Sequence, residues 1–293
     1  MEQSGRPVIS LVAASRTLEG AGFPVRRPFP TADLDNIDPF LMLDEVGPID
    51  WPPGAAIGAP DHPHRGFETI SYILDGEKLH EDSTGDRQIL GPGDVQWMTA
   101  GSGIVHSELP GPRIREQGGR SHGFQIWVNL PARHKMAPPR YQFVGADRIP
   151  LARAADGLVS VRVIAGEAFG VDATIDTHTP VMLQDWTIRP GGTASPVYPM
   201  EHRLAAYVFA GGLAAGRDGR MVADGQLVIF GEGDRIDLAV PATADQAARF
   251  LLFGGEPIGE PIARHGPFVM NTREELLRAF EDYRSGRMGT IRR

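Results

Sequence analysis

Cysteine is absent from the 293-residue sequence, and its absence excludes several classes of site. The chain cannot form disulfides, zinc ribbons or iron–sulfur clusters, and it has no cysteine nucleophile. A metal site must use histidine, aspartate or glutamate, which favours iron, manganese, nickel, copper or catalytic zinc. Lysine is also scarce, at Lys78 and Lys135 only, and composition alone assigns no function to this bias.

Positive charge and long apolar runs are scarce too. The chain has 37 acidic residues against 29 lysines and arginines, a net charge of −8. Such a surface repels phosphate backbones, so we expect no direct nucleic-acid binding. No run approaches a membrane span, and the N-terminal region lacks the apolar stretch of a signal peptide. These observations predict a soluble cytoplasmic protein without membrane contact.

Glycine and proline, by contrast, are abundant at 36 and 25 residues and are spread along the chain. They bound short apolar runs, a pattern typical of an all-β sandwich or barrel. The clearest runs are Ile70–Leu74, Val95–Met98, Phe124–Leu130, Val159–Ile164, Val181–Ile188, Ala205–Phe209, Leu227–Phe230 and Phe250–Phe253. A capping box at Thr272–Glu275, followed by apolar residues at helical spacing, predicts one helix over about 272–285.

A weak internal repeat divides the sequence. Tyr72–Gly76 resembles Tyr207–Gly211, at an offset of 135, and Gly93–Met98 resembles Gly225–Phe230, at an offset of 132. The repeat predicts two copies of one β-barrel, joined near Arg133–Asp147. We therefore expect an N-terminal domain over 1–135 and a C-terminal domain, with the helix, over 136–293.

Two doublets of polar residues carry the strongest chemical signal, His62 with His64 and His106 with Glu108. Residues two apart on a strand point to the same face, so each doublet can share one face. On neighbouring strands of a barrel, the doublets would offer three imidazoles and one carboxylate, enough for a transition metal with open coordination positions. The alternative is two exposed polar loops; the apolar residues beside each doublet favour the buried site.

The other histidines are expected to have ordinary roles. His80 lies among Glu77, Lys78, Glu81 and Asp82, which predicts a solvated strand or turn. His202 precedes a strand of the second repeat, and its charged neighbours predict a place at the surface.

Longer blocks of sequence resemble the pirin family of the cupin superfamily, over about residues 25–290. These blocks are Asp38–Glu45, Asp61–Thr69, Pro92–Gly101, Gly103–Glu108, Gln125–Pro131, Gly254–Pro261 and Gly266–Thr272. The resemblance implies two cupin barrels of the jelly-roll type packed face to face, with a C-terminal helix.

The resemblance also implies one divalent metal ion per chain, usually Fe(II), in the N-terminal barrel. The family's ligands carry over to His62, His64, His106 and Glu108; manganese, nickel, copper and zinc also suit this set. Glu68 lies one residue before the position of the glutamate in the general cupin motif. A shift of one residue turns a strand side chain to the opposite face, so we do not expect Glu68 to be a ligand.

The repeat offsets can be applied to the ligands themselves. They place Val197, Pro199, Leu238 and Val240 at the corresponding positions of the second barrel. None of these side chains can bind a metal, so we expect the second barrel to be metal-free.

Two functions remain open from the sequence. The favoured one, supported by the family's quercetin 2,3-dioxygenases, is dioxygenase activity on a flavonol or similar aromatic polyol with O₂. Glu108 would be the base, and the pocket would be lined by Phe40, Met42, Phe67 and Gln125.

The alternative, also known in the family, is an iron-dependent, redox-sensing regulator that binds a transcription factor or metabolic enzyme. The acidic surface favours a protein partner over DNA. A purely structural metal is disfavoured because structural sites are usually closed. We expect a monomer.

Overall fold

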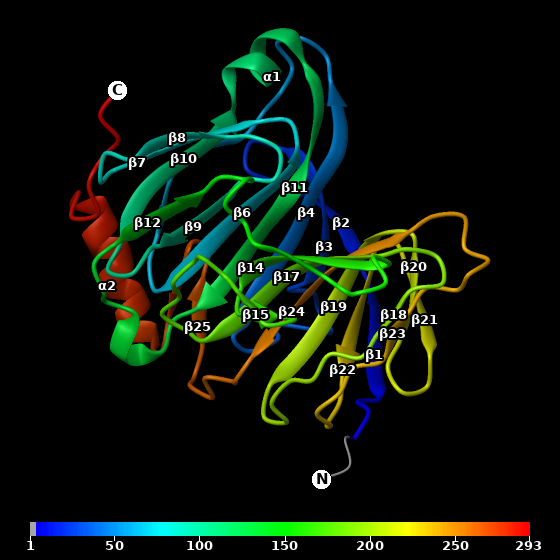
Figure 1. Ribbon diagram of the computed structural model, residues 1–293. Helices are drawn as coiled ribbons and strands as arrows, with labels where there is room; N and C mark the ends of the chain where they lie inside the picture. The colour runs from blue at the N-terminus through cyan, green and yellow to red at the C-terminus, as the bar shows by residue number, and fades with distance from the viewer. Residues whose placement is uncertain (1–3) are drawn as a thin grey trace. The chain divides into compact units, whose positions relative to one another are not determined.

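The computed structural model describes residues 4–293, which form two compact units, each rich in β-strands (Figure 1). The first unit contains Arg16–Arg27, Phe40–Asp147 and Ile258–Arg293. The second contains residues 4–15 together with Pro28–Pro39 and Arg148–Pro257. Both units are therefore discontinuous in sequence, whereas the expected domains, 1–135 and 136–293, are contiguous ranges.

Pairing and packing near the chain ends account for this discontinuity. Strand β1 (Val8–Ala13) pairs with β22 (Gln226–Phe230) and so extends a sheet of the second unit. Helix α2 (Arg273–Arg284) packs in the first unit on the hairpin of β25 (Ala263–His265) and β26 (Phe268–Met270). Apolar side chains bury this contact, among them Phe268, Leu276 and Ala279.

The first unit is built from two antiparallel sheets. The larger has seven strands, in the order β12 (Arg140–Val144), β9 (Val95–Thr99), β6 (Phe67–Asp75), β11 (Gly119–Asn129), β4 (Phe40–Trp51), β3 (Phe23–Phe29) and β2 (Ser15–Glu19). The smaller has four strands, in the order β5 (Ala59–His64), β10 (Ile104–Pro110), β7 (Lys78–Asp82) and β8 (Arg87–Leu90).

The second unit repeats this topology. Its seven-stranded sheet has the order β1, β22, β19 (Arg203–Ala210), β24 (Ala248–Gly255), β17 (Val181–Ile188), β14 (Val159–Ala165) and β13 (Leu151–Arg153). Its four-stranded sheet has the order β18 (Thr193–Ala194), β23 (Leu238–Ala239), β20 (Gly212–Ala215) and β21 (Arg220–Ala223). A short hairpin, β15 (Glu167–Ala168) with β16 (Val171–Asp172), completes it. Strands β6 and β9 thus correspond to β19 and β22, which confirms the repeat.

The predicted elements agree with the structure. Each of the eight apolar runs lies on a strand, although Phe124–Leu130 extends one residue beyond the end of β11. Helix α2 begins after Thr272, and the reciprocal hydrogen bonds of the predicted capping box, between Thr272 and Glu275, are both present. Two short elements are additional: helix α1 (Pro112–Gln117) and the 3₁₀-helix η1 (Ala132–His134). Within residues 4–293, no helix is long and apolar enough to cross a membrane.

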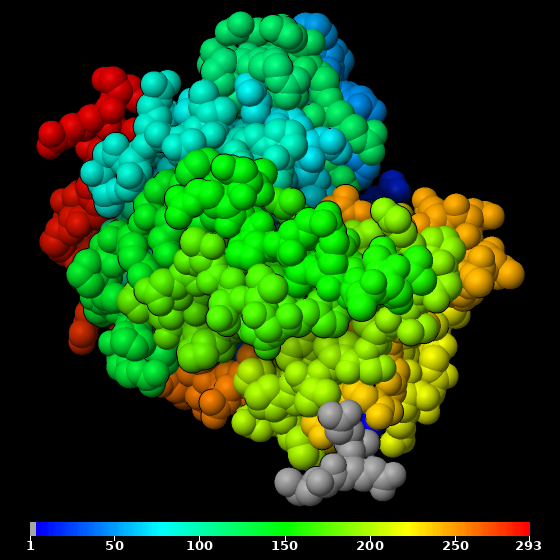
Figure 2. Space-filling view, in the orientation of Figure 1, coloured from blue at the N-terminus to red at the C-terminus, as the bar shows by residue number. Residues whose placement is uncertain are grey.

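Helix α1 marks one end of the first unit. It follows β10 and leads into β11, whose first residue, Gly119, pairs with Trp51 at the end of β4. In the space-filling view this end of the unit forms a projection (Figure 2). Trp51 and Ile114 of this projection also line a cavity. The projection therefore helps to enclose the site described below.

Lys135, which follows η1, is almost completely buried at 2% exposure. Its ammonium donates to the carbonyl oxygens of Gly66 at 2.8 Å and Val269 at 3.0 Å and to Oδ1 of Asn129 at 2.7 Å. Buried acceptors that lose a donor cost roughly 1 kcal/mol or more each. We therefore expect Lys135→Met to lower the free energy of unfolding by about 3 kcal/mol. Urea unfolding measures this, with exposed Arg133→Met as the control; equal stability of the two variants would contradict the assigned role.

Candidate metal centre

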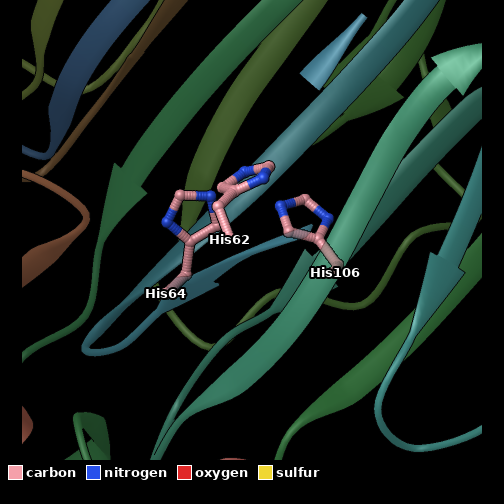
Figure 3. A group of neighbouring side chains, drawn as sticks. All are labelled: His62, His64 and His106. Atoms are coloured by element: carbon pink, nitrogen blue, oxygen red, sulfur yellow. The ribbon is translucent and has the colours of Figure 1, made fainter. Parts of the chain in front are cut away.

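Three histidines of the first unit meet at one point. His62 and His64 lie on β5 and His106 on the adjacent β10, where His106 pairs directly with His62. The ring centroids are 4.3 Å apart for His62 and His106, 4.7 Å for His62 and His64, and 4.9 Å for His64 and His106. One ring nitrogen from each lies within 4.8 Å of the others, and Figure 3 shows the three rings close together. The predicted convergence of the three imidazoles is thus present.

Two of the rings are oriented by backbone carbonyl groups. Nδ1 of His62 lies 2.7 Å from the oxygen of Pro60, and Nδ1 of His64 lies 3.3 Å from that of Pro267. A proton on each Nδ1 satisfies these contacts and leaves the lone pair of Nε2 for a metal ion. Such carbonyl partners are typical of histidines that bind metals.

His106 provides the clearest sign that a ligand belongs here. The residue is completely buried, yet neither of its ring nitrogens has a hydrogen-bond partner among the described residues. Buried polar atoms are normally paired, since burial without a partner costs free energy. A metal ion would supply that partner, so the three histidines fit the divalent metal ion that the family resemblance implies.

Burial also favours the neutral form of His64 and of His106, the form that binds metals. It lowers the pKa of His64 to about 3, assisted by the nearby His62. Burial and the two neighbouring imidazoles likewise hold the pKa of His106 well below its usual value.

Glu108 lies next to the three histidines but is not part of their cluster. Its Oε1 accepts hydrogen bonds from the hydroxyl of Ser71 at 2.6 Å and from Nζ of Lys78 at 3.3 Å. Burial by itself raises the pKa of Glu108, but Lys78 and Ser71 outweigh it and bring the pKa to about 2. The carboxylate is therefore ionised and anchored through one oxygen.

Glu68 has a different environment. It is completely buried, and its Oε1 accepts a hydrogen bond from the hydroxyl of Thr99 at 2.7 Å. It does not belong to the histidine cluster. Its neighbour Thr69, on the other face of β6, accepts a hydrogen bond from Gln125 at 2.6 Å.

The prediction for His80 was wrong. His80 is completely buried, and its Nε2 lies 3.0 Å from Oδ2 of Asp82. Its ring stacks on Tyr141, with 4.7 Å between centroids, and lies 5.4 Å from that of His106. The charged neighbours gave a wrong indication because Asp82 is itself buried: its Oδ1 accepts hydrogen bonds from the turn that follows, and its Oδ2 faces His80.

His202, which was expected at the surface, is half-buried and so is less exposed than expected.

A cavity of about 560 Å³ opens beside this centre within the first unit. His62, His64 and Glu108 lie in its wall, and most of its lining surface is apolar. The apolar and aromatic lining residues include Met42, Val46, Ile49, Trp51, Phe124 and Trp127. Cavities of this size and character commonly bind small organic molecules.

The four residues predicted for the pocket divide into two pairs. Met42 and Gln125 line the cavity. Phe40 and Phe67 are completely buried and are not among its lining residues. Phe67 instead packs behind the centre, with its ring centroid 5.0 Å from that of His64.

Sequence reasoning did not assign Ser71, Lys78 or Trp127 to the site. Ser71 lies on β6, Lys78 on β7 and Trp127 on β11, and the fold brings each of them to the cavity wall or to Glu108. Their only signal was the alternation of side chains along each strand, which cannot show which strands become neighbours.

The fold and the histidine cluster together define a class: a protein of two cupin domains, one of which has a candidate metal centre. Comparison with known proteins assigns the family. The profile named Pirin matches residues 22–128, and that of the Pirin C-terminal cupin domain matches residues 183–289. The chain belongs to the pirin family.

Relatives resemble the chain over almost its whole length. A pirin-like protein of Solanum lycopersicum is 42% identical over 97% of this chain and 93% of its own. Pirin of Homo sapiens is 39% identical over 98% of this chain and 95% of its own. A crystal structure of quercetin 2,3-dioxygenase from Acinetobacter baumannii superposes with a TM-score of 0.91, at 33% identity over 99% of this chain and 100% of that one.

Proposed function

We propose that this protein is a metal-dependent dioxygenase of the quercetin 2,3-dioxygenase type, with Fe(II) held by His62, His64, His106 and Glu108. The observation that carries the proposal is a largely apolar cavity of about 560 Å³ with two of the clustered histidines in its wall. A flat aromatic polyol fits such a cavity, and the solved relative named as a quercetin 2,3-dioxygenase supports this substrate class.

Each part of the site has a distinct role in this proposal. The imidazoles and the carboxylate hold the ion, which supplies the one-electron chemistry that O₂ needs to react with a closed-shell organic molecule. The apolar walls exclude water and orient the aromatic rings. Glu108 lies in the cavity wall, and we assign it as the base that accepts the proton of an acidic substrate hydroxyl.

Anaerobic reconstitution with Fe(II), followed by addition of quercetin and O₂, tests the proposal. We expect one equivalent of iron per chain and O₂ uptake that depends on both iron and quercetin. Iron binding without O₂ uptake for quercetin or other flavonols would overturn the dioxygenase proposal and favour the regulatory alternative.

The cavity also predicts a size-dependent effect at Val46. This residue lines the cavity and pairs across the strands with Gly123, which has no side chain to compete for space. Val46→Phe places a ring in the cavity and should raise the KM for a flavonol about tenfold, equivalent to roughly 1.4 kcal/mol of lost binding. Iron content should stay unchanged. An unchanged KM would show that the substrate binds elsewhere.

A further inference from the structure

Lys78 is one of only two lysines in the chain, and it lies at the cavity wall. Its Nζ is 3.3 Å from Oε1 of Glu108, 3.2 Å from Oγ of Ser71 and 3.3 Å from Oε1 of Gln125. The Glu108 and Lys78 side chains are 9% and 21% exposed, so water screens this pair only in part. The ammonium group is therefore directed at the carboxylate next to the three histidines.

Both hydrogen bonds to Glu108 end on the same oxygen. Ser71 and Lys78 contact Oε1, which leaves Oε2 as the atom that Glu108 can offer to an ion. We infer that Lys78 makes Glu108 a weak, exchangeable fourth ligand, because it pairs with Oε1 and leaves Oε2 for the ion. The inference rests on the proposed metal centre and adds a residue that sets the strength of one ligand.

The ammonium withdraws charge from the carboxylate through their contact, and this makes the carboxylate a weaker ligand for a cation. Removing it should therefore strengthen metal binding. Glu108 would keep its position in such a variant, because the shorter bond from Ser71, at 2.6 Å, remains.

The affinity of the metal-free protein for a divalent ion measures the effect of Lys78 directly. We would titrate Co(II) against a competing chelator in wild type, Lys78→Met, Glu108→Gln and the double variant. The control is Arg120→Met, which removes one positive charge from an exposed side chain outside the cavity. Thermal unfolding of each metal-free variant reports whether it folds.

We expect K78M to bind Co(II) about tenfold more tightly than wild type. In the E108Q background, K78M should change the affinity much less than tenfold. R120M should leave the affinity within about twofold of wild type, because an exposed charge is screened. If folded wild-type protein did not bind Co(II), the metal centre itself would be refuted. Co(II) binding by wild type with an unchanged or weaker affinity in K78M would refute only the role of Lys78, as would an equal gain in the E108Q background.

Discussion

His106→Ala is expected to lower metal affinity more than about 100-fold and to abolish O₂ uptake with a flavonol. The expected loss is this large because His106 is one of the three clustered imidazoles and has no other partner for either ring nitrogen among residues 4–293. Metal analysis after reconstitution and gel filtration, together with O₂ uptake, measures both losses.

The same substitution separates a ligand from a structural residue. Alanine leaves a cavity, which destabilises the fold, but it also removes two buried nitrogens without partners, which stabilises it. The two effects partly offset each other. The metal-free variant should unfold within about 2 kcal/mol of the metal-free wild type. His202→Ala, in the second unit, should leave the metal content unchanged. Full metal occupancy in H106A would contradict the assignment of the centre.

Glu108→Gln is expected to lower metal affinity about 10- to 100-fold, because the amide keeps the shape of the carboxylate but lacks its charge. Turnover should fall further, since the amide cannot accept the substrate proton. The matched control is Glu68→Gln, because this carboxylate is also buried but lies on β6, in the other sheet, and is bonded to Thr99.

Metal titration and steady-state O₂ uptake of the two glutamine variants distinguish their roles. E68Q should retain metal affinity within about twofold, because its amide oxygen can still accept the bond from Thr99. If E68Q emptied the site and E108Q did not, the assignment of ligand faces on these strands would be reversed.

Much of the centre could be predicted because it depends on short-range geometry. The spacing of His62 and His64 places both rings on one face of β5, and the fold then needs only one neighbouring strand to add His106. The second unit shows the limit of this reasoning. Leu238 and Val240 are buried in its apolar core, as expected for residues that cannot bind a metal. That this unit is metal-free stays a prediction.

The surroundings of the centre were beyond sequence reasoning because they depend on strand order. Ser71, Lys78 and Glu108 come from β6, β7 and β10, and their hydrogen bonds exist only where these strands converge. His80 was misjudged for a related reason: charges at neighbouring positions indicated solvent, whereas the fold buries His80 beside His106. The local signal gave no sign of a buried carboxylate partner.

X-ray absorption spectroscopy of the Fe(II)-reconstituted protein tests the central claim most directly, because it reports the ligands of the ion itself. We predict one iron per chain with three imidazole ligands and a carboxylate oxygen, and loss of bound iron in H106A. Iron bound with fewer than two imidazole ligands, or retained unchanged in H106A, would contradict it.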